Sequence, residues 1–121
     1  MMTVLVIEDN FEIRENTSEI LALAGYEVLC AQNGREGIRM AAEAIPDIIL
    51  CDIMMPEVTG YEVLTCLRAD SGTASIPFIF VTASGEKSEV ELAMSMGADG
   101  YIRKPYDSKE LFQLIGKCLS E

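Results

Sequence analysis

Short apolar runs alternate with longer amphipathic segments along the chain, and five such pairs follow one another. Three of the runs are unbroken and rich in β-branched or aromatic residues; they are Val4–Ile7, Ile48–Cys51 and Phe78–Val81. An unbroken apolar run of this length is typical of a strand that is covered on both faces of its sheet. Two further runs contain or adjoin charged residues, so we expect them at the edges of the sheet; they are Tyr26–Cys30 and Tyr101–Ile102.

Between these strands, apolar residues recur at the spacing of helices that turn one face toward a core. The first stripe comprises Ile13, Thr17, Ile20, Leu21 and Ala24, and the last comprises Leu111, Leu114, Ile115 and Cys118. Asn33 and Asp107 each stand three residues before a glutamate, which predicts that the second and fifth helices begin there. Gly25 and Gly97 should end the first and fourth helices, because glycine readily adopts a positive φ. The third helix is predicted over roughly Glu57–Ala69.

Five strand–helix units predict an α/β fold with a five-stranded parallel sheet, because each helix serves as a right-handed crossover. With the second and fifth strands at the edges, the strand order becomes 2-1-3-4-5. This is the flavodoxin-like, doubly wound arrangement, in which ligands bind at the carboxyl ends of the first and third strands. The chain has 121 residues and no linker-like segment, so we expect one domain over residues 1–121.

Charge and composition narrow the function. The chain has 9 Lys and Arg, 20 Asp and Glu, no His and a net charge of −11. Such an acidic surface repels a phosphate backbone, so we expect no direct nucleic-acid binding, and the lack of His removes the usual general base. No apolar run approaches the ~20 residues of a membrane span, so we expect no membrane insertion. The four cysteines form no C-x-x-C pair, and we expect each to pack as a small buried residue in a reducing cytoplasm.

Polar residues stand at the carboxyl ends of four predicted strands, where this fold binds its ligands. They are Glu8 and Asp9 after the first strand, Asp52 after the third, Thr82 after the fourth and Lys104 after the fifth. Three clustered carboxylates repel one another unless a cation neutralises them, and an oxygen-only ligand set favours Mg²⁺. Thr82 can donate to a phosphoryl oxygen, and Lys104 can pair with Asp52 and balance phosphate charge. No P-loop motif is present, which leaves a carboxylate as the phosphoryl acceptor.

These residues resemble the receiver domain of two-component response regulators, over the whole chain. The matching motifs are the acidic pair Glu8 and Asp9, Asp52 with Pro56 and Gly60 at D-x-x-x-P-x-x-x-G spacing, VTAS with Thr82, and YIRKP with Lys104. The resemblance implies that Asp52 accepts a phosphoryl group from a phosphohistidine of a sensor histidine kinase or a histidine phosphotransfer protein. It further implies that Thr82 and Lys104 contact the phosphoryl oxygens. It assigns the Mg²⁺ ligands to Glu8, Asp9, Asp52 and the backbone carbonyl of Met54.

The same resemblance implies a switch rather than an enzyme with a separate substrate, although the domain assists its own phosphorylation and dephosphorylation. Tyr101 would change rotamer on activation, and the face built from the fourth helix, fifth strand and fifth helix would carry the signal. The Lys104–Pro105 peptide bond would be cis, which proline makes energetically reasonable. An output domain outside this chain and dimerisation on phosphorylation are both compatible with the resemblance.

Three other functions share part of the pattern. An FMN electron carrier of the flavodoxin type needs a Ser/Thr-rich turn after the first strand, where Glu8 and Asp9 would instead repel the FMN phosphate. A hydrolase of the haloacid dehalogenase type needs a general acid two residues after its nucleophile, and Met54 stands there. A receiver-like interaction module that has lost phosphorylation would have no need of the whole acidic and Lys104 constellation.

Overall fold

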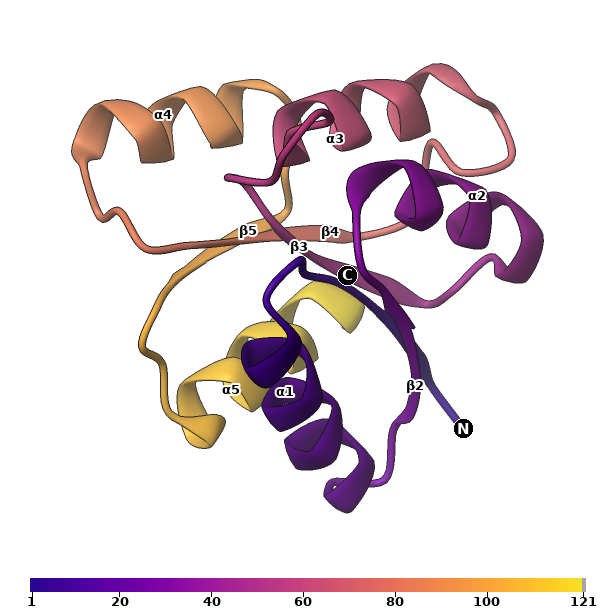
Figure 1. The fold of residues 1–121 in the computed structure, drawn as a ribbon, viewed down its shortest axis with the longest axis vertical. Coiled ribbons are helices and arrows are strands. Elements are labelled where there is room, and N and C mark those ends of the chain that lie inside the picture. The colour runs from indigo at the N-terminus through magenta and orange to yellow at the C-terminus, as the bar shows by residue number, and fades with distance from the viewer. Residues whose placement is uncertain (121) are drawn as a thin grey trace.

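The computed structural model describes residues 1–120, which form a five-stranded parallel sheet between two layers of helices (Figure 1). The strands are β1 Thr3–Ile7, β2 Glu27–Ala31, β3 Ile48–Asp52, β4 Phe78–Thr82 and β5 Gly100–Arg103. The helices are α1 Phe11–Leu23, α2 Gly34–Ala44, α3 Gly60–Ala69, α4 Lys87–Ser95 and α5 Ser108–Leu119. The strand order is β2-β1-β3-β4-β5 with parallel pairing throughout, which confirms the predicted flavodoxin-like fold.

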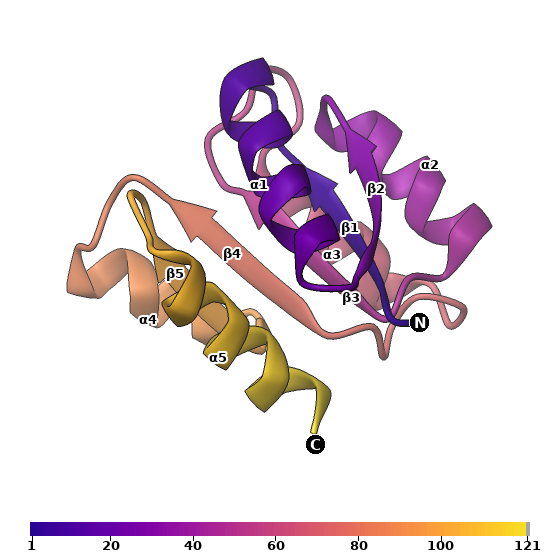
Figure 2. The ribbon, with the colours of Figure 1, turned by 90° about the horizontal axis from the view of Figure 1, so that it is seen from below.

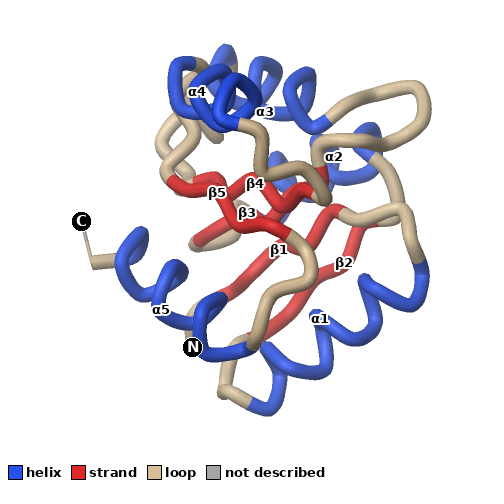
Figure 3. Tube along the Cα trace, turned by 90° about the vertical axis from the view of Figure 1, so that its left-hand side faces the viewer, coloured by secondary structure: helices blue, strands red, loops and turns tan. Residues whose placement is uncertain are grey.

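Helices cover both faces of the sheet: α1 and α5 lie on one side, and α2, α3 and α4 on the other (Figures 1 and 3). Figure 2 looks onto the α1 and α5 side. Each face has its own hydrophobic cluster, with Leu5 and Phe80 in one and Val4 and Ile79 in the other. Every residue of β3 and β4 is buried, which explains their unbroken apolar runs. Within residues 1–120, no helix has the length and apolarity that a bilayer crossing requires.

The amphipathic stripe of α1 is confirmed except at its end. Thr17 and Leu21 are buried, but Ala24 is exposed because α1 ends one residue earlier and Ala24 is its C-cap. At the start of α1, Asn10 rather than Asp9 is the cap, and its side chain accepts a 3.0 Å hydrogen bond from a first-turn amide. The Asp9 carboxylate therefore does not serve as the cap of α1. In the stripe of α5, Leu111, Ile115 and Cys118 are buried and Leu114 is partly buried.

The predicted caps of α2 and α5 are present. Asn33 Oδ1 accepts a 2.8 Å hydrogen bond from the Glu36 amide, and Asp107 Oδ1 accepts a 2.7 Å bond from the Glu110 amide. The turns after α1 and α4 use glycine with positive φ, as the sequence predicted: φ is 97° at Gly25 and 96° at Gly97.

The predicted start of α3 is wrong by three residues, because the helix begins at Gly60. Glu57 has a φ of 66°, in the left-handed region, and so cannot open the helix. Thr59 is the cap: its hydroxyl accepts from the Glu62 amide, and the Glu62 carboxylate accepts from the Thr59 amide. This reciprocal pair is a capping box, and its T-x-x-E signature is visible in the sequence.

The cysteines only partly follow the prediction that all are buried. Cys51 and Cys118 are buried and Cys30 is half-buried, but Cys66 is exposed. The core-facing residues of α3 include Val63 and Leu67, and Cys66 lies on a different face of that helix.

Candidate functional site

The polar residues singled out in the sequence meet at the carboxyl rim of the sheet. Glu8 directly follows β1, Asp52 ends β3, Thr82 ends β4 and Lys104 directly follows β5. The parallel register aligns these strand ends, and the Lys104 amide donates a 2.7 Å hydrogen bond to the Thr82 carbonyl. Residues that lie far apart in the sequence thus come together because β1, β3, β4 and β5 end at one edge.

Three carboxylates form a compact acidic cluster at this rim. Glu8, Asp9 and Asp52 each offer one oxygen, and these atoms lie within 4.8 Å of one another. Glu8 and Asp52 are buried, whereas Asp9 is exposed. Carboxylate oxygens with access to water on one side suit Mg²⁺, which prefers oxygen ligands and retains several waters. The cluster therefore fits the predicted cation.

Lys104 reaches into the acidic cluster and contacts two of its carboxylates. Its Nζ lies 2.6 Å from Glu8 Oε1 and 3.5 Å from Asp52 Oδ2. The sequence predicted the pair with Asp52, but the closer partner is Glu8, which is the more deeply buried carboxylate at 4% exposure. A buried carboxylate requires a charge partner or hydrogen-bond donors, and the Asn10 amide supplies a further donor to Glu8 at 3.1 Å.

Burial and mutual repulsion spread the pKa values of the cluster apart. Burial raises the pKa of Asp52 to about 7, and the charge of Glu8 adds to that rise while Lys104 opposes it. Burial also acts to raise the pKa of Glu8, but the hydrogen bonds from Lys104 and Asn10 outweigh it and hold that pKa below its usual range. Burial and the neighbouring Glu8 raise the pKa of Asp9. A bound cation would favour the carboxylate form of Asp52, which is the form that can act as a nucleophile.

The loop between Asp52 and α3 is held tightly against the strand end. The Gly60 amide donates a 2.9 Å hydrogen bond to the Ile53 carbonyl. A Cβ at position 60 would lie 2.4 Å from the backbone oxygen of Asp52, so only glycine permits this approach. The close approach of these two backbone segments therefore requires the glycine of the D-x-x-x-P-x-x-x-G motif. Met54, in the same loop, is 74% exposed, and the role of its carbonyl as a metal ligand stays a prediction.

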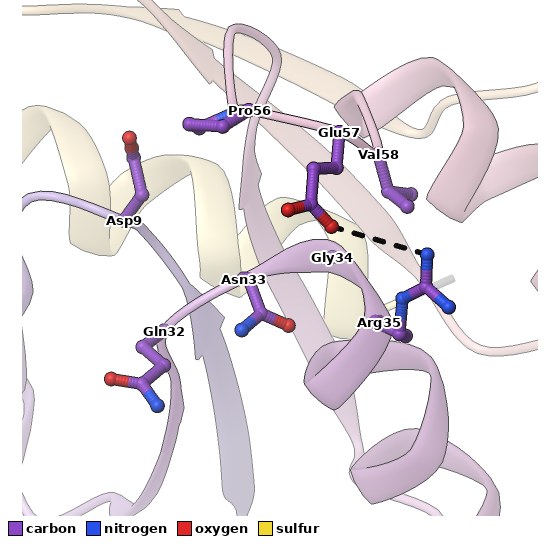
Figure 4. A pocket seen from close by; sticks show the side chains of 8 residues that line it. All are labelled: Asp9, Gln32, Asn33, Gly34, Arg35, Pro56, Glu57 and Val58. Carbon is purple, nitrogen blue, oxygen red and sulfur yellow. Dashed lines mark ion pairs between the residues drawn. The ribbon is translucent and has the colours of Figure 1, made fainter.

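Asp9 also lines a pocket of 290 Å³ between the loops that precede α2 and α3 (Figure 4). Figure 4 shows Asp9 on one side of this pocket and the ion pair of Arg35 and Glu57, with a separation of 4.0 Å, on the other. Both side chains of that pair are highly exposed, so the pair contributes little stability. The pocket gives water access to the Asp9 side of the acidic cluster.

Thr82 and Tyr101 are linked through a residue that the sequence analysis did not single out. Thr82 is buried, and its hydroxyl donates a 2.8 Å hydrogen bond to Glu89 Oε1 in α4. The Tyr101 ring is half-buried, and its hydroxyl lies 3.3 Å from the same oxygen and also contacts the Ser84 carbonyl. Burial and the Glu89 charge raise the pKa of Tyr101. Glu89 is one of two glutamates on α4, and no motif marks it.

A second unpredicted contact joins α1 to the loop before α5. The Thr17 and Tyr106 hydroxyls lie 2.6 Å apart, across 89 residues of sequence. Both side chains line a 660 Å³ groove together with Lys104 and Pro105. The Lys104–Pro105 peptide bond is cis, as the resemblance implied. Thr17 was predicted only as part of an apolar stripe, although a buried hydroxyl there needs a partner.

Comparison with known proteins identifies the family. The response regulator receiver domain pattern matches residues 4–116, nearly the whole chain. The chain belongs to this family. It is a receiver domain of the kind found in two-component response regulators, which act as signalling switches, and the flavodoxin-type electron carrier is not favoured.

Receiver domains of full-length regulators are similar in sequence. The phosphate regulon transcriptional regulatory protein PhoB of Pseudomonas aeruginosa is 38% identical over 109 residues, which cover 90% of this chain and 48% of PhoB. The DNA-binding dual master transcriptional regulator RpaA of Synechocystis is 38% identical over 119 residues, which cover 98% of this chain and 49% of RpaA. The chain thus spans about half the length of these two relatives.

Solved receiver structures agree with the fold. Chemotaxis protein CheY4 of Vibrio cholerae superposes with a TM-score of 0.93 at 32% identity, covering 98% of this chain and 99% of CheY4. The receiver domain of a sensor histidine kinase from Pseudomonas aeruginosa has a TM-score of 0.92 at 26% identity, with 99% of this chain and 98% of that domain covered. That second structure has a magnesium ion coordinated in its active site cleft.

Proposed function

We propose that Asp52 is the phosphoacceptor of this receiver domain and that Mg²⁺ assists its phosphorylation by a phosphohistidine on a sensor histidine kinase or a histidine phosphotransfer protein. One observation carries the proposal: three carboxylates lie within 4.8 Å of one another, with the Lys104 ammonium beside them. Such a cluster is unfavourable for folding by itself, since like charges repel. It becomes favourable when a cation and a phosphoryl group share the site.

Each residue then has a separate task. Glu8, Asp9, Asp52 and the Met54 carbonyl would hold Mg²⁺, which supplies positive charge to the phosphoryl oxygens when bound. An Asp52 carboxylate oxygen attacks phosphorus, so that an O–P bond forms as the N–P bond to the donor imidazole breaks. Lys104 balances the added negative charge, and Thr82 donates its hydroxyl hydrogen to a phosphoryl oxygen. Tyr101 would change rotamer in response to the movement of Thr82.

The output of the switch would lie on the face formed by α4, β5 and α5. Two apolar residues of α4 are exposed, Leu92 at 49% and Met94 at 45%. They stand two positions apart and so point to opposite flanks of the helix, which leaves at most one of them on this face for an output domain or a second copy to cover after phosphorylation. The net charge of −11 disfavours direct nucleic-acid binding by this chain.

We assign residues 1–121 to one domain. We place this domain in the cytoplasm, because the exposed thiol of Cys66 suits a reducing compartment.

Phosphorylation by a small-molecule donor tests this function. The chain is incubated with acetyl phosphate or phosphoramidate and Mg²⁺, and its intact mass is measured. The wild type should gain one phosphoryl group, while Asp52→Asn should gain none. Asp70→Asn is the matched control and should gain a phosphoryl group as the wild type does. Asp70 is exposed, and its side-chain oxygen accepts a hydrogen bond from the Gly72 amide, which an asparagine oxygen can also accept. An unchanged wild-type mass, or an equal gain in Asp52→Asn, rules out the proposal.

A further inference from the structure

The Thr82 hydroxyl already has an acceptor in α4. It donates to Glu89 Oε1 at 2.8 Å, and it accepts a 3.2 Å hydrogen bond from the Ser84 amide. A threonine hydroxyl carries a single hydrogen, so it can donate to one strong acceptor at a time. If Thr82 donates to a phosphoryl group on Asp52, it must release Glu89.

Glu89 is well placed to compete with a phosphoryl group for the Thr82 hydroxyl. Thr82 is 1% exposed and Glu89 is half-buried, so water has almost no access to the hydroxyl and only partial access to the carboxylate. A hydrogen bond to a carboxylate is stronger than one between neutral groups, and shielding from water strengthens it further. The same Glu89 oxygen lies 3.3 Å from the Tyr101 hydroxyl, which keeps the carboxylate between the two switch residues.

We propose that Glu89 is a positioning residue that holds the Thr82 hydroxyl in the orientation it has before Asp52 is phosphorylated. Loss of the Thr82–Glu89 hydrogen bond when Asp52 is phosphorylated then couples Asp52 to α4. This inference rests on the proposed phosphorylation of Asp52. Glu89 belongs to α4, whereas Thr82 ends β4, so breaking their bond removes a direct tie between the sheet and that helix. The coupling is reciprocal: removal of Glu89 must favour the phosphoryl-bound state.

The test uses Mg²⁺ with beryllofluoride as the phosphoryl mimic and measures its affinity for the chain by calorimetry. Glu89→Ala should bind about tenfold more tightly than the wild type, because one charge-assisted hydrogen bond no longer competes. Glu89→Gln is close in shape and keeps an amide oxygen as acceptor, so its gain should be smaller. Glu91→Gln, an equal charge change on an exposed residue of the same helix, should leave the affinity unchanged.

A double-mutant cycle separates the hydrogen bond from a simple charge effect. In the Thr82→Val background there is no hydroxyl to compete for, so Glu89→Ala should no longer change the affinity. Equal affinities of Glu89→Ala and the wild type would overturn the inference, and so would a full gain that persists in Thr82→Val. If the wild-type chain binds no beryllofluoride at all, the proposed function of Asp52 fails first and this inference falls with it.

Discussion

Lys104 Nζ lies 2.6 Å from Glu8 Oε1. This contact crosses 96 residues of sequence and joins the end of β5 to the end of β1. Burial opposes the Lys104 charge, but Glu8 and Asp52 more than compensate and raise the pKa of the ammonium. Lys104 therefore offsets part of the negative charge of the rim, in addition to the phosphate contact proposed for it.

Loss of Lys104 should therefore destabilise the metal-free protein. Lys104→Ala leaves Glu8 buried without its cation, and breaking a buried pair in this way costs about 3 kcal/mol. Urea denaturation with and without Mg²⁺ measures this, and Mg²⁺ should restore part of the loss. Lys109→Ala, at an exposed position of α5, is the control and should change the free energy of unfolding by less than about 0.5 kcal/mol. Equal effects of the two substitutions would contradict this role of Lys104.

Mg²⁺ should raise the melting temperature of the wild type, because the proposed metal site exists only in the folded chain. Asp9→Ala removes one of the three clustered carboxylates and should greatly reduce that rise. Glu15→Ala, an exposed position of α1, should respond to Mg²⁺ as the wild type does. Thermal melts over a Mg²⁺ titration measure the effect, and an undiminished response in Asp9→Ala would exclude Asp9 from the site.

The raised pKa of Asp52, about 7, predicts a pH dependence of stability in the absence of metal. The folded state binds the Asp52 proton more tightly than the unfolded state, so the free energy of unfolding falls as pH rises from about 4 to 7. Asp52→Asn has no ionisable group at this position, so its free energy of unfolding does not fall for this reason. We expect Asp52→Asn to be more stable than the wild type at pH 8, by on the order of 2 kcal/mol, with the difference shrinking toward pH 4. A difference that does not vary with pH in metal-free denaturation curves would disprove the shift.

Gly60 and Gly116 form a matched pair for substitution by alanine. A Cβ at position 60 would meet the backbone of Asp52, whereas one at position 116 has nothing within 4 Å. Gly60→Ala should destabilise by about 2 kcal/mol or more through this overpacking and should slow phosphorylation by displacing Asp52. Gly116→Ala, inside α5, should stabilise by about 0.5–1 kcal/mol. Chemical denaturation and phosphoramidate kinetics check both, and a tolerated alanine at position 60 would contradict the close approach.

The fold was predictable because its strands carry distinct patterns. Complete burial of β3 and β4 leaves unbroken apolar runs, while the charged Glu27 and Arg103 mark the two edge strands. Together with right-handed crossovers, these patterns are sufficient for the strand order. The strand ends then place Asp52 and Thr82 at one rim without further information.

What escaped prediction depends on side-chain geometry that has no sequence period. Glu89 lies seven residues after Thr82 on an exposed-looking helix, and its meeting with that hydroxyl follows from the position of α4 over β4 and β5. The Thr17–Tyr106 contact spans 89 residues and depends on the loop before α5. The closer approach of Lys104 to Glu8 than to Asp52 is likewise a matter of tertiary placement.

The most direct test of the central claim is to locate the phosphoryl group in the chain. After incubation with phosphoramidate and Mg²⁺, borohydride reduces an aspartyl phosphate to homoserine, which peptide mass mapping then finds. Homoserine should appear at position 52 alone, and only in samples that contained Mg²⁺. Homoserine at another aspartate, or an equal yield at position 52 without Mg²⁺, would contradict the proposed site.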